Sequence, residues 1–277
     1  MIVSIASGKG GTGKTTVAVN MALSLQNVQL LDCDVEEPNA YLLLHPKIKE
    51  TKPVYLWVPV VDEKKCNYCG ECAKFCQFNA LFVAIQKVLF FPELCHGCGG
   101  CAIVCPRNAI KEKKRKIGTI KIGVADGIQL VYGELNVGEP MATPVIAEVK
   151  KQSQNNSTVI IDSPPGTSCP VIESVYKSDY CILVTEPTPF GLYDLKIAVE
   201  VLERLNIPLG VIVNRAGIGD RKVYEYCREK EIPILLEISY NKRIAELYSS
   251  GTPFVLKMPE WKQKFQQVFG EIKGRST

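Results

Sequence analysis

A glycine-rich loop near the start of the chain has the residue types needed to hold a nucleotide. Residues 2–6 read as a buried strand, and residues 16–23 read as a helix. Glycines let successive backbone N–H groups surround phosphate oxygens, and the helix N-terminus adds partial positive charge. Lys14 can then reach the β- and γ-phosphates, and the Thr15 hydroxyl can hold Mg²⁺. The predicted nucleotide site consists of Gly8, Lys9, Gly10, Gly11, Thr12, Gly13, Lys14, Thr15 and Thr16.

A second set of chemically active residues is an array of eight cysteines with regular spacing. The array consists of Cys66-x-x-Cys69-x-x-Cys72-x-x-x-Cys76 and a second run with the same spacing, Cys95-x-x-Cys98-x-x-Cys101-x-x-x-Cys105. The sequence shows no secretory leader, and in such a chain twelve cysteines favour metal ligation over disulfides. Triplets of this kind differ from the separated pairs of zinc sites.

The spacing of the two runs resembles that of two-cluster bacterial ferredoxins. The resemblance implies two [4Fe–4S] clusters, each bound by three cysteines of one run and the fourth cysteine of the other. One implied ligand set is Cys66, Cys69, Cys72 and Cys105, and the other is Cys95, Cys98, Cys101 and Cys76. The sequence departs from the ferredoxin pattern at Gln77, where a proline would follow the fourth cysteine. The ligand set stays complete, and the local loop shape stays open.

The glycine-rich loop also resembles that of a known family of ATPases. The stretch Lys9-Gly10-Gly11-Thr12-Gly13-Lys14-Thr15 is similar to the deviant P-loop of MinD/Mrp-type ATPases, in the nitrogenase iron protein-like superfamily. The resemblance implies ATP as ligand and a homodimer in which Lys9 reaches the partner's nucleotide, as an arginine finger does. A solvent-exposed lysine near the polyphosphate is the alternative interpretation.

Carboxylates follow two further strand-like runs. Asp32-Cys33-Asp34 follows residues 28–31, and Asp162 ends the run at 158–162. Beside a P-loop, the carboxyl ends of parallel strands hold Mg²⁺ and the attacking water. By resemblance to the family's switch I and Walker B segments, Asp34 orients the water and joins Thr15 and Asp162 at Mg²⁺. Lys9, Lys14 and Asp34 are then the catalytic residues. An aspartate pair that caps a helix over 38–44 is the alternative.

Three more positions are assigned by the same resemblance. Asn214 and Pro187 lie in stretches similar to the family's adenine-side loops, although an Asx-turn is a rival explanation for Asn214. Cys169 stands seven residues after Asp162, where the related nitrogenase iron protein has a cluster-bridging cysteine. An ordinary free thiol is the simpler interpretation of Cys169.

The pattern along the chain predicts the fold class and the domains. With 277 residues the chain can form one large core and a small second module. We predict a mostly parallel, doubly wound α/β P-loop sheet with an inserted small α+β ferredoxin-like module. Residues 1–60 and 118–277 would form the ATPase domain, and residues 61–117 the module. Strands are expected at 55–61, 181–185, 210–213 and 234–236, with a hairpin over 118–135 and a helix over 259–272 that docks on the domain.

Together these features predict a dimeric, Mg²⁺-dependent ATPase. It would couple nucleotide state to iron–sulfur electron transfer, or to assembly and delivery of iron–sulfur or related metal cofactors, with a protein partner. A MinD-like positioning or scaffold protein with redox-sensing or structural clusters is the alternative. The basic run at 111–116 reads as a solvated face without interleaved aromatic residues, so we expect neither nucleic acid nor a membrane as partner. The absence of a leader and of long apolar runs predicts a cytoplasmic protein.

Overall fold

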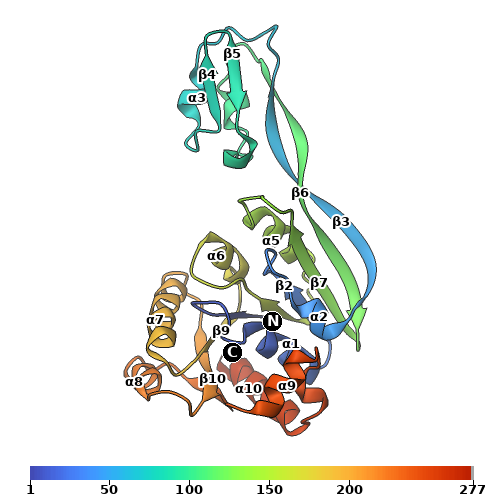
Figure 1. Ribbon diagram of the computed structural model, residues 1–277, viewed down its shortest axis with the longest axis vertical. Helices are drawn as coiled ribbons and strands as arrows, with labels where there is room; N and C mark the ends of the chain where they lie inside the picture. Colours follow the sequence, from blue (N-terminus) through green and yellow to red (C-terminus); the bar gives the residue numbers. More distant parts are fainter. Residues whose placement is uncertain (276–277) are drawn as a thin grey trace.

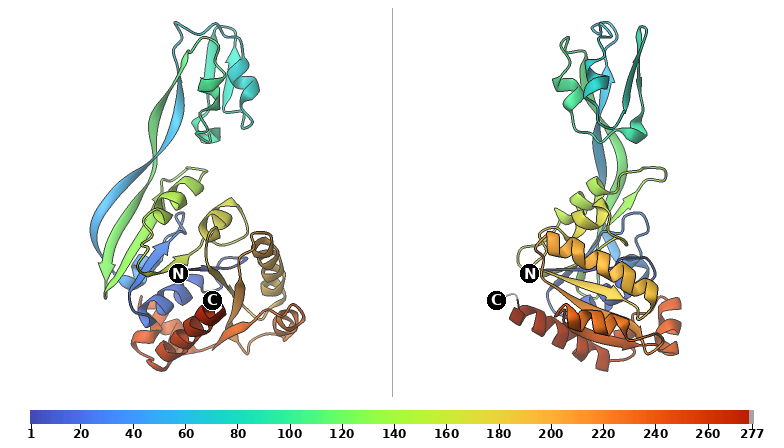
Figure 2. Two further views of the ribbon diagram at one scale, coloured as in Figure 1. Left: turned by 180° about the vertical axis from the view of Figure 1, so that it is seen from behind. Right: turned by 90° about the vertical axis from the view of Figure 1, so that its left-hand side faces the viewer.

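The computed structural model describes residues 1–275 and consists of two parts joined by a long two-stranded ribbon (Figure 1, Figure 2). Within these residues a nine-stranded sheet has the order β11-β10-β9-β1-β8-β2-β7-β6-β3. The strands from β11 to β7 in this order run parallel, whereas β6 pairs antiparallel with both β7 and β3. The prediction of a mostly parallel α/β fold is confirmed.

In chain order the elements are β1 (Ile2–Ala6), α1 (Lys14–Ser24), β2 (Val28–Asp32), α2 (Ala40–Leu44), β3 (Lys47–Val61), α3 (Glu71–Phe75), β4 (Leu81–Ala84), β5 (Lys87–Phe90), the 3-10 helix η1 (Pro92–Leu94), α4 (Gly100–Ile103), β6 (Ile110–Ala125), β7 (Ile128–Leu135), α5 (Thr143–Lys150), β8 (Thr158–Asp162), α6 (Cys169–Val175), β9 (Tyr180–Thr185), α7 (Pro189–Arg204), β10 (Leu209–Ala216), α8 (Lys222–Glu229), β11 (Ile234–Ser239), α9 (Lys242–Ser249), the 3-10 helix η2 (Phe254–Leu256) and α10 (Glu260–Arg275).

Helices cover both faces of the parallel strands, so alternate strand residues face different helices. Leu30 of β2 packs in the apolar cluster that includes α1 and α10, whereas the next residue, Leu31, packs with α5. The terminal helix docks on the domain as predicted: Phe265 of α10 is fully buried, and the Gln266 side chain donates to the Ser24 carbonyl at 2.9 Å. Within residues 1–275 no helix is long and apolar enough to cross a membrane.

The ribbon consists of β3 and the first half of β6, and it carries the cysteine-rich module away from the parallel strands of the sheet (Figure 1). Its register runs from Lys47 opposite Val124 to Val61 opposite Ile110. The sequence predicted only the segments 55–61 and 118–125 as strands. The structure extends both strands, because their backbone groups pair across the ribbon even where the side chains are charged. Residue 61 ends β3, and residue 117 lies inside β6.

The two halves of the module at the tip of the ribbon have the same local backbone conformation. The short helices α3 and α4 each begin after a glycine in the left-handed conformation, Gly70 with φ of 82° and Gly99 with φ of 72°. Positions 29 residues apart share positive φ, namely Tyr68 and Gly97, Gly70 and Gly99, and Asn79 and Asn108. The duplication in the sequence is therefore also a duplication of local structure.

Candidate nucleotide and cysteine sites

A pocket of about 420 Å³ lies beside the glycine-rich loop, where strands of the parallel sheet end. Its volume is typical of small-molecule sites, which run from about 300 to 1,000 Å³. Among the predicted nucleotide residues, those that line it are Gly10, Gly11, Gly13, Lys14, Thr15, Thr16, Asp34 and Asn214. The predicted residues outside this lining are Gly8, Lys9, Thr12, Asp162 and Pro187.

The loop owes its shape to glycines and to one asparagine. Gly13, directly before α1, has φ of 95°, and a Cβ there would stand 2.5 Å from Asn214 Nδ2. Asn214 Nδ2 donates to the Thr12 carbonyl at 2.8 Å, and its Oδ1 accepts from the Arg215 N–H at 2.9 Å. Asn214 therefore fastens the loop from the side of β10. A contact between Asn214 and the adenine stays a prediction.

Lys14 lies among carboxylates at the base of the pocket. Its buried Nζ stands 4.0 Å from Asp34 Oδ2. Both side-chain oxygens of Asp162 are buried and accept no hydrogen bond from the described part of the chain. Burial raises the pKa of Asp162, and the positive charge of Lys14 partly opposes this effect. Apart from the Lys14 charge, only the Thr15 hydroxyl opposes the effect of burial on this carboxylate, and a cation would stabilise it further, so these residues fit a bound Mg²⁺.

The two aspartates after β2 differ in their surroundings. Burial raises the pKa of Asp34 to about 6, although Lys14 opposes the shift. Asp32 is fully buried, and its carboxylate accepts from the N–H groups of Asp34, Asn39 and Ala40 at 3.0–3.1 Å. Asp32 therefore caps the start of α2, as in the alternative interpretation, whereas Asp34 faces the pocket and Lys14.

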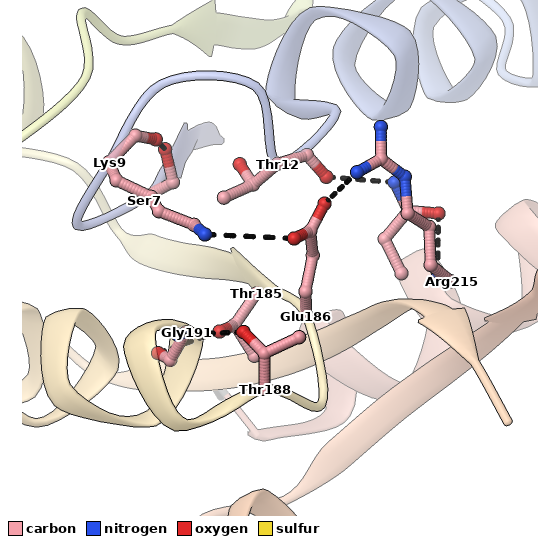
Figure 3. A network of polar contacts seen from close by, with 9 residues as sticks. Ser7, Lys9, Thr12, Thr185, Glu186, Thr188, Gly191 and Arg215 are labelled. Carbon is pink, nitrogen blue, oxygen red and sulfur yellow. Dashed lines mark hydrogen bonds and ion pairs between the residues drawn. The ribbon is translucent and has the colours of Figure 1, made fainter. Parts of the chain in front are cut away.

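Lys9 is turned toward its own chain (Figure 3). Its Nζ lies 3.6 Å from Glu186 Oε2, and Arg215 holds the other carboxylate oxygen at 2.5 Å. Glu186 directly follows β9 and its side chain is 9% exposed. The start of α7 supports this corner, because Thr188 Oγ1 accepts from the Gly191 N–H at 3.0 Å. A lysine that acts across a dimer would have to leave Glu186.

Two predicted residues lie elsewhere around the parallel sheet. The Pro187 carbonyl accepts from the Asp220 N–H at 3.1 Å, so Pro187 packs against the loop before α8. Cys169 is exposed as the first residue of α6. Its role as a bridging thiol stays a prediction.

Two small cavities in the module are each lined by four cysteines. The proximal quartet, which lies with Trp57 of the ribbon, is Cys76, Cys95, Cys98 and Cys101. The distal quartet, which lies with Val61 at the ribbon's end, is Cys66, Cys69, Cys72 and Cys105. Each cavity thus combines three cysteines of one run with the fourth of the other.

The thiols of each quartet affect one another electrostatically. Burial raises the pKa of Cys72, and Cys66 and Cys105 raise it further. Burial likewise raises the pKa of Cys101 to about 11, with Cys95 contributing. Within residues 1–275 no group of three or more His, Cys, Asp or Glu side chains forms a site for a single metal ion. Four sulfurs around one cavity are the donor set of a [4Fe–4S] cluster, which fits each quartet.

A continuous path of contacts joins the pocket to the proximal quartet. The Val35 carbonyl, directly after Asp34, accepts from the Leu135 N–H at 2.8 Å. The next residue, Asn136, donates its N–H to the Ile117 carbonyl in β6 at 2.9 Å. Two residues before Ile117, Arg115 forms an ion pair with Glu139 and donates to the Pro92 carbonyl at 3.3 Å. We call this route the Val35–Arg115 path.

Sequence reasoning missed Glu186, Glu139 and the ribbon residue Trp57. Each is a single residue in a loop or a strand, and its partners come from distant parts of the chain. Residues 55–61 are apolar throughout, so no local pattern marked Trp57 as an exposed residue.

Strand β1, the glycine loop and α1 on this parallel sheet define a P-loop NTPase. Residues 3–254 match the CobQ/CobB/MinD/ParA nucleotide-binding domain, and the chain belongs to this family. It is 37% identical to the uncharacterized protein MJ0579 of Methanocaldococcus jannaschii over 263 residues, covering 92% of this chain and 91% of that protein. It is 24% identical to an iron–sulfur cluster carrier protein of the same organism, covering 98% and 83% of the two chains.

A solved structure shares the fold. The septum site-determining protein MinD of Pyrococcus horikoshii, complexed with Mg-ADP, matches with a TM-score of 0.61 and 21% identity. The match covers 100% of this chain and 98% of the other. At this identity the likeness concerns the fold alone.

Proposed function

We propose that this chain is a dimeric, Mg²⁺-dependent ATPase of the deviant P-loop type, which couples its nucleotide state to two resident [4Fe–4S] clusters used in electron transfer. The observation that carries the proposal is the pair of cavities in the module. Each is lined by three cysteines of one run and the fourth of the other. This crossed arrangement is the ligand pattern of two-cluster ferredoxins.

In the nucleotide half, residues of the glycine loop cradle the phosphates and Lys14 contacts the β- and γ-phosphates. Thr15, Asp34 and Asp162 hold Mg²⁺, which neutralises charge on the phosphate oxygens. Asp34, with its carboxylate at the pocket, orients the attacking water. Lys9 leaves Glu186 in the dimer and approaches the partner's nucleotide.

In the module, residues 61–117, the proximal and distal quartets hold one cluster each, and the clusters supply one-electron chemistry. The chain's own contribution is to place N–H donors on the ligand sulfurs. The N–H groups of Ala80 and Ala109 donate to Cys76 Sγ and Cys105 Sγ at 3.4 and 3.3 Å. Such donors stabilise the charged thiolate and tune the reduction potential.

A second candidate function is the assembly or delivery of iron–sulfur clusters in the cytoplasm. It is favoured by the relative named an iron–sulfur cluster carrier protein, which covers most of this chain. In that case the clusters would be cargo and would leave the protein. Apo-ferredoxin would then be a suitable acceptor.

The test begins with anaerobically purified protein, assayed for iron, sulfide and ATP hydrolysis. We expect about eight iron and eight sulfide per chain, because two cubanes need eight thiolates. Cluster midpoint potentials that differ between ADP and a non-hydrolysable ATP analogue support the electron-transfer role. Cluster transfer to apo-ferredoxin with ATP supports delivery instead. Zinc in place of iron, or ATP hydrolysis with no response at the clusters and no transfer, contradicts both.

A further inference from the structure

One face of the ribbon, between the ATPase unit and the tip of the module, is both aromatic and basic. Tyr55 and Trp57 of β3 are 44% and 49% exposed, and they stand directly opposite Lys116 and Lys114 of β6. Opposite residues of an antiparallel pair share a face. Lys114 Nζ lies 5.5 Å from the Tyr55 ring centroid and 5.3 Å from that of Trp57. We call these four residues the Trp57 face.

The packing of the ribbon does not require aromatic residues at these positions. The alternate residues Leu56 and Val58 point to the other side and are buried in the apolar cluster that continues into the ATPase unit. Strand β3 is also the edge of the sheet, and Figures 1 and 2 show the ribbon with the ATPase unit and the module on the same side. Exposed aromatic side chains beside cations are typical of protein interfaces.

The Trp57 face adjoins the proximal quartet. Trp57 lines the quartet's cavity, and it also lines an open hollow of about 290 Å³ at the surface with Gly97, Cys98, Gly99 and Glu112. The cysteine loop reaches this face of the ribbon, since a Cβ on Gly99 would stand 3.4 Å from Oε1 of Glu112, which lies two residues before Lys114 on the same face. A protein seated on this hollow would therefore approach the proximal cluster closely. Close approach matters because electron transfer slows steeply with distance.

Positive charge is concentrated on the same segment. Residues 111–116 include five basic residues and one acidic residue. Residues 62–110, which form the rest of the module, include five basic and four acidic residues, so they are nearly balanced. A local basic patch attracts an acidic partner and orients it during encounter.

We propose that the Trp57 face and the hollow at Cys98 form the docking surface for an acidic iron–sulfur electron-transfer protein. Lys114 and Lys116 attract the partner's carboxylates, while Tyr55 and Trp57 form the desolvated centre of a small interface, as redox encounters have. The redox purpose of the contact rests on the proposed function. The docking itself depends on the exposed residues of the ribbon and of the hollow, and not on a redox reaction.

The test is a titration of the anaerobic holo-protein with an acidic plant-type [2Fe–2S] ferredoxin, with the dissociation constant measured by calorimetry. We compare the wild type with Lys114→Glu/Lys116→Glu at about 50 mM and 500 mM salt. Charge reversal should weaken binding at least about tenfold at low salt and about threefold or less at high salt, because exposed charges are screened. Tyr55→Ala should weaken binding at both salt concentrations, with iron content and cluster spectrum retained, because Tyr55 is exposed and lies outside the cavity of the proximal quartet.

The matched control is Lys222→Glu/Lys242→Glu, which makes the same change in net charge on α8 and α9. These two lysine side chains are 65% and 87% exposed. The control should bind the ferredoxin within about twofold of the wild type, since the partner docks elsewhere. Equal weakening by the control and the ribbon variant would mean that net charge alone drives binding, and would overturn the proposal.

Other occupants give distinct results. If Lys114→Glu/Lys116→Glu abolishes binding of an oligothymidine probe but leaves ferredoxin binding unchanged, the face belongs to nucleic acid and the proposal is wrong. If it changes only self-association in sedimentation, the face belongs to a second copy of the chain and the proposal is likewise wrong. Wild-type protein without iron would refute the proposed function. The same titrations would still decide whether the Trp57 face binds the acidic protein.

Discussion

If nucleotide state reaches the clusters through the Val35–Arg115 path, then breaking that path at Glu139 should uncouple them. Binding of the γ-phosphate reorders segments such as the one that follows β2 in P-loop proteins. Here that segment is hydrogen-bonded to the end of β7, and the loop after β7 carries Glu139 to Arg115. Arg115 in turn donates to the Pro92 carbonyl, three residues before Cys95 of the proximal quartet. Glu139→Gln removes the charge that holds Arg115 in this position.

The size of the effect follows from burial and from linkage. The side chains of Arg115 and Glu139 are 26% and 13% exposed, so the pair is mostly buried. Removing one partner of a fully buried pair costs about 3–5 kcal/mol, and partial exposure here reduces that to about 2 kcal/mol. Allosteric coupling is typically about 1–3 kcal/mol, which for a one-electron couple is about 40–130 mV. In the wild type we expect the cluster midpoint potential to differ between the ADP state and the ATP-analogue state. Glu139→Gln should lose more than half of this difference.

The assay is an EPR-monitored redox titration with ADP, with a non-hydrolysable ATP analogue and with neither. The matched control is Glu134→Gln, which breaks the ion pair between Lys121 of β6 and Glu134 of β7, where both side chains are about one-third exposed. This pair lies outside the Val35–Arg115 path, so the control should keep the nucleotide-dependent shift. Equal potentials in all three states of the wild type would refute the coupling. A full shift in Glu139→Gln would refute the path.

Four other predictions concern the sites themselves. Cys98→Ser should lose the proximal cluster preferentially, so that the protein retains about half of the wild-type iron. ATP binding should persist. Loss of all iron would contradict two clusters with separate ligand sets. Because the folded pKa of Asp34 is raised to about 6, kcat/KM for ATP should rise with pH up to about 6 and then level off. A raised pKa means that the folded protein disfavours the ionised form of Asp34, which predominates at pH 7.5 but not at pH 4. Asp34→Asn should therefore raise the Tm of nucleotide-free protein more at pH 7.5 than at pH 4. Asp34→Ala should bind ATP without turnover, and mixing it with Lys9→Ala should restore some hydrolysis if Lys9 acts in trans.

The sequence predicted the parallel sheet well because its strands are buried on both faces. Runs such as residues 158–162 are almost wholly apolar up to a terminal carboxylate, and that pattern points to a central strand. The ribbon escaped prediction because its first β6 residues are nearly all charged. Their strand conformation comes from pairing with β3 across about fifty residues of intervening chain, and no local pattern encodes such pairing.

The residues of the two sites also differ in whether a local sequence pattern identifies them. The glycine loop and the cysteine runs are local motifs, so their residues could be identified from spacing alone. The partners that hold Lys9 and Arg115 are not local. Glu186 meets Lys9 across more than 170 residues, and Glu139 meets Arg115 only after β6 and β7 have folded back. Single charged residues in loops carry no periodic signal, so only the folded chain reveals these pairs.

The order of the strands explains how a module at the end of a long ribbon can respond to a nucleotide. Strand β7 lies between β2, which leads to Asp34, and β6, which forms half of the ribbon. It is therefore the one strand of the described sheet that touches both the pocket side and the module side. A shift of the segment after β2 must either move the end of β7 or break the hydrogen bond between Val35 and Leu135. We expect that bond to persist, so that the motion passes outward to the module.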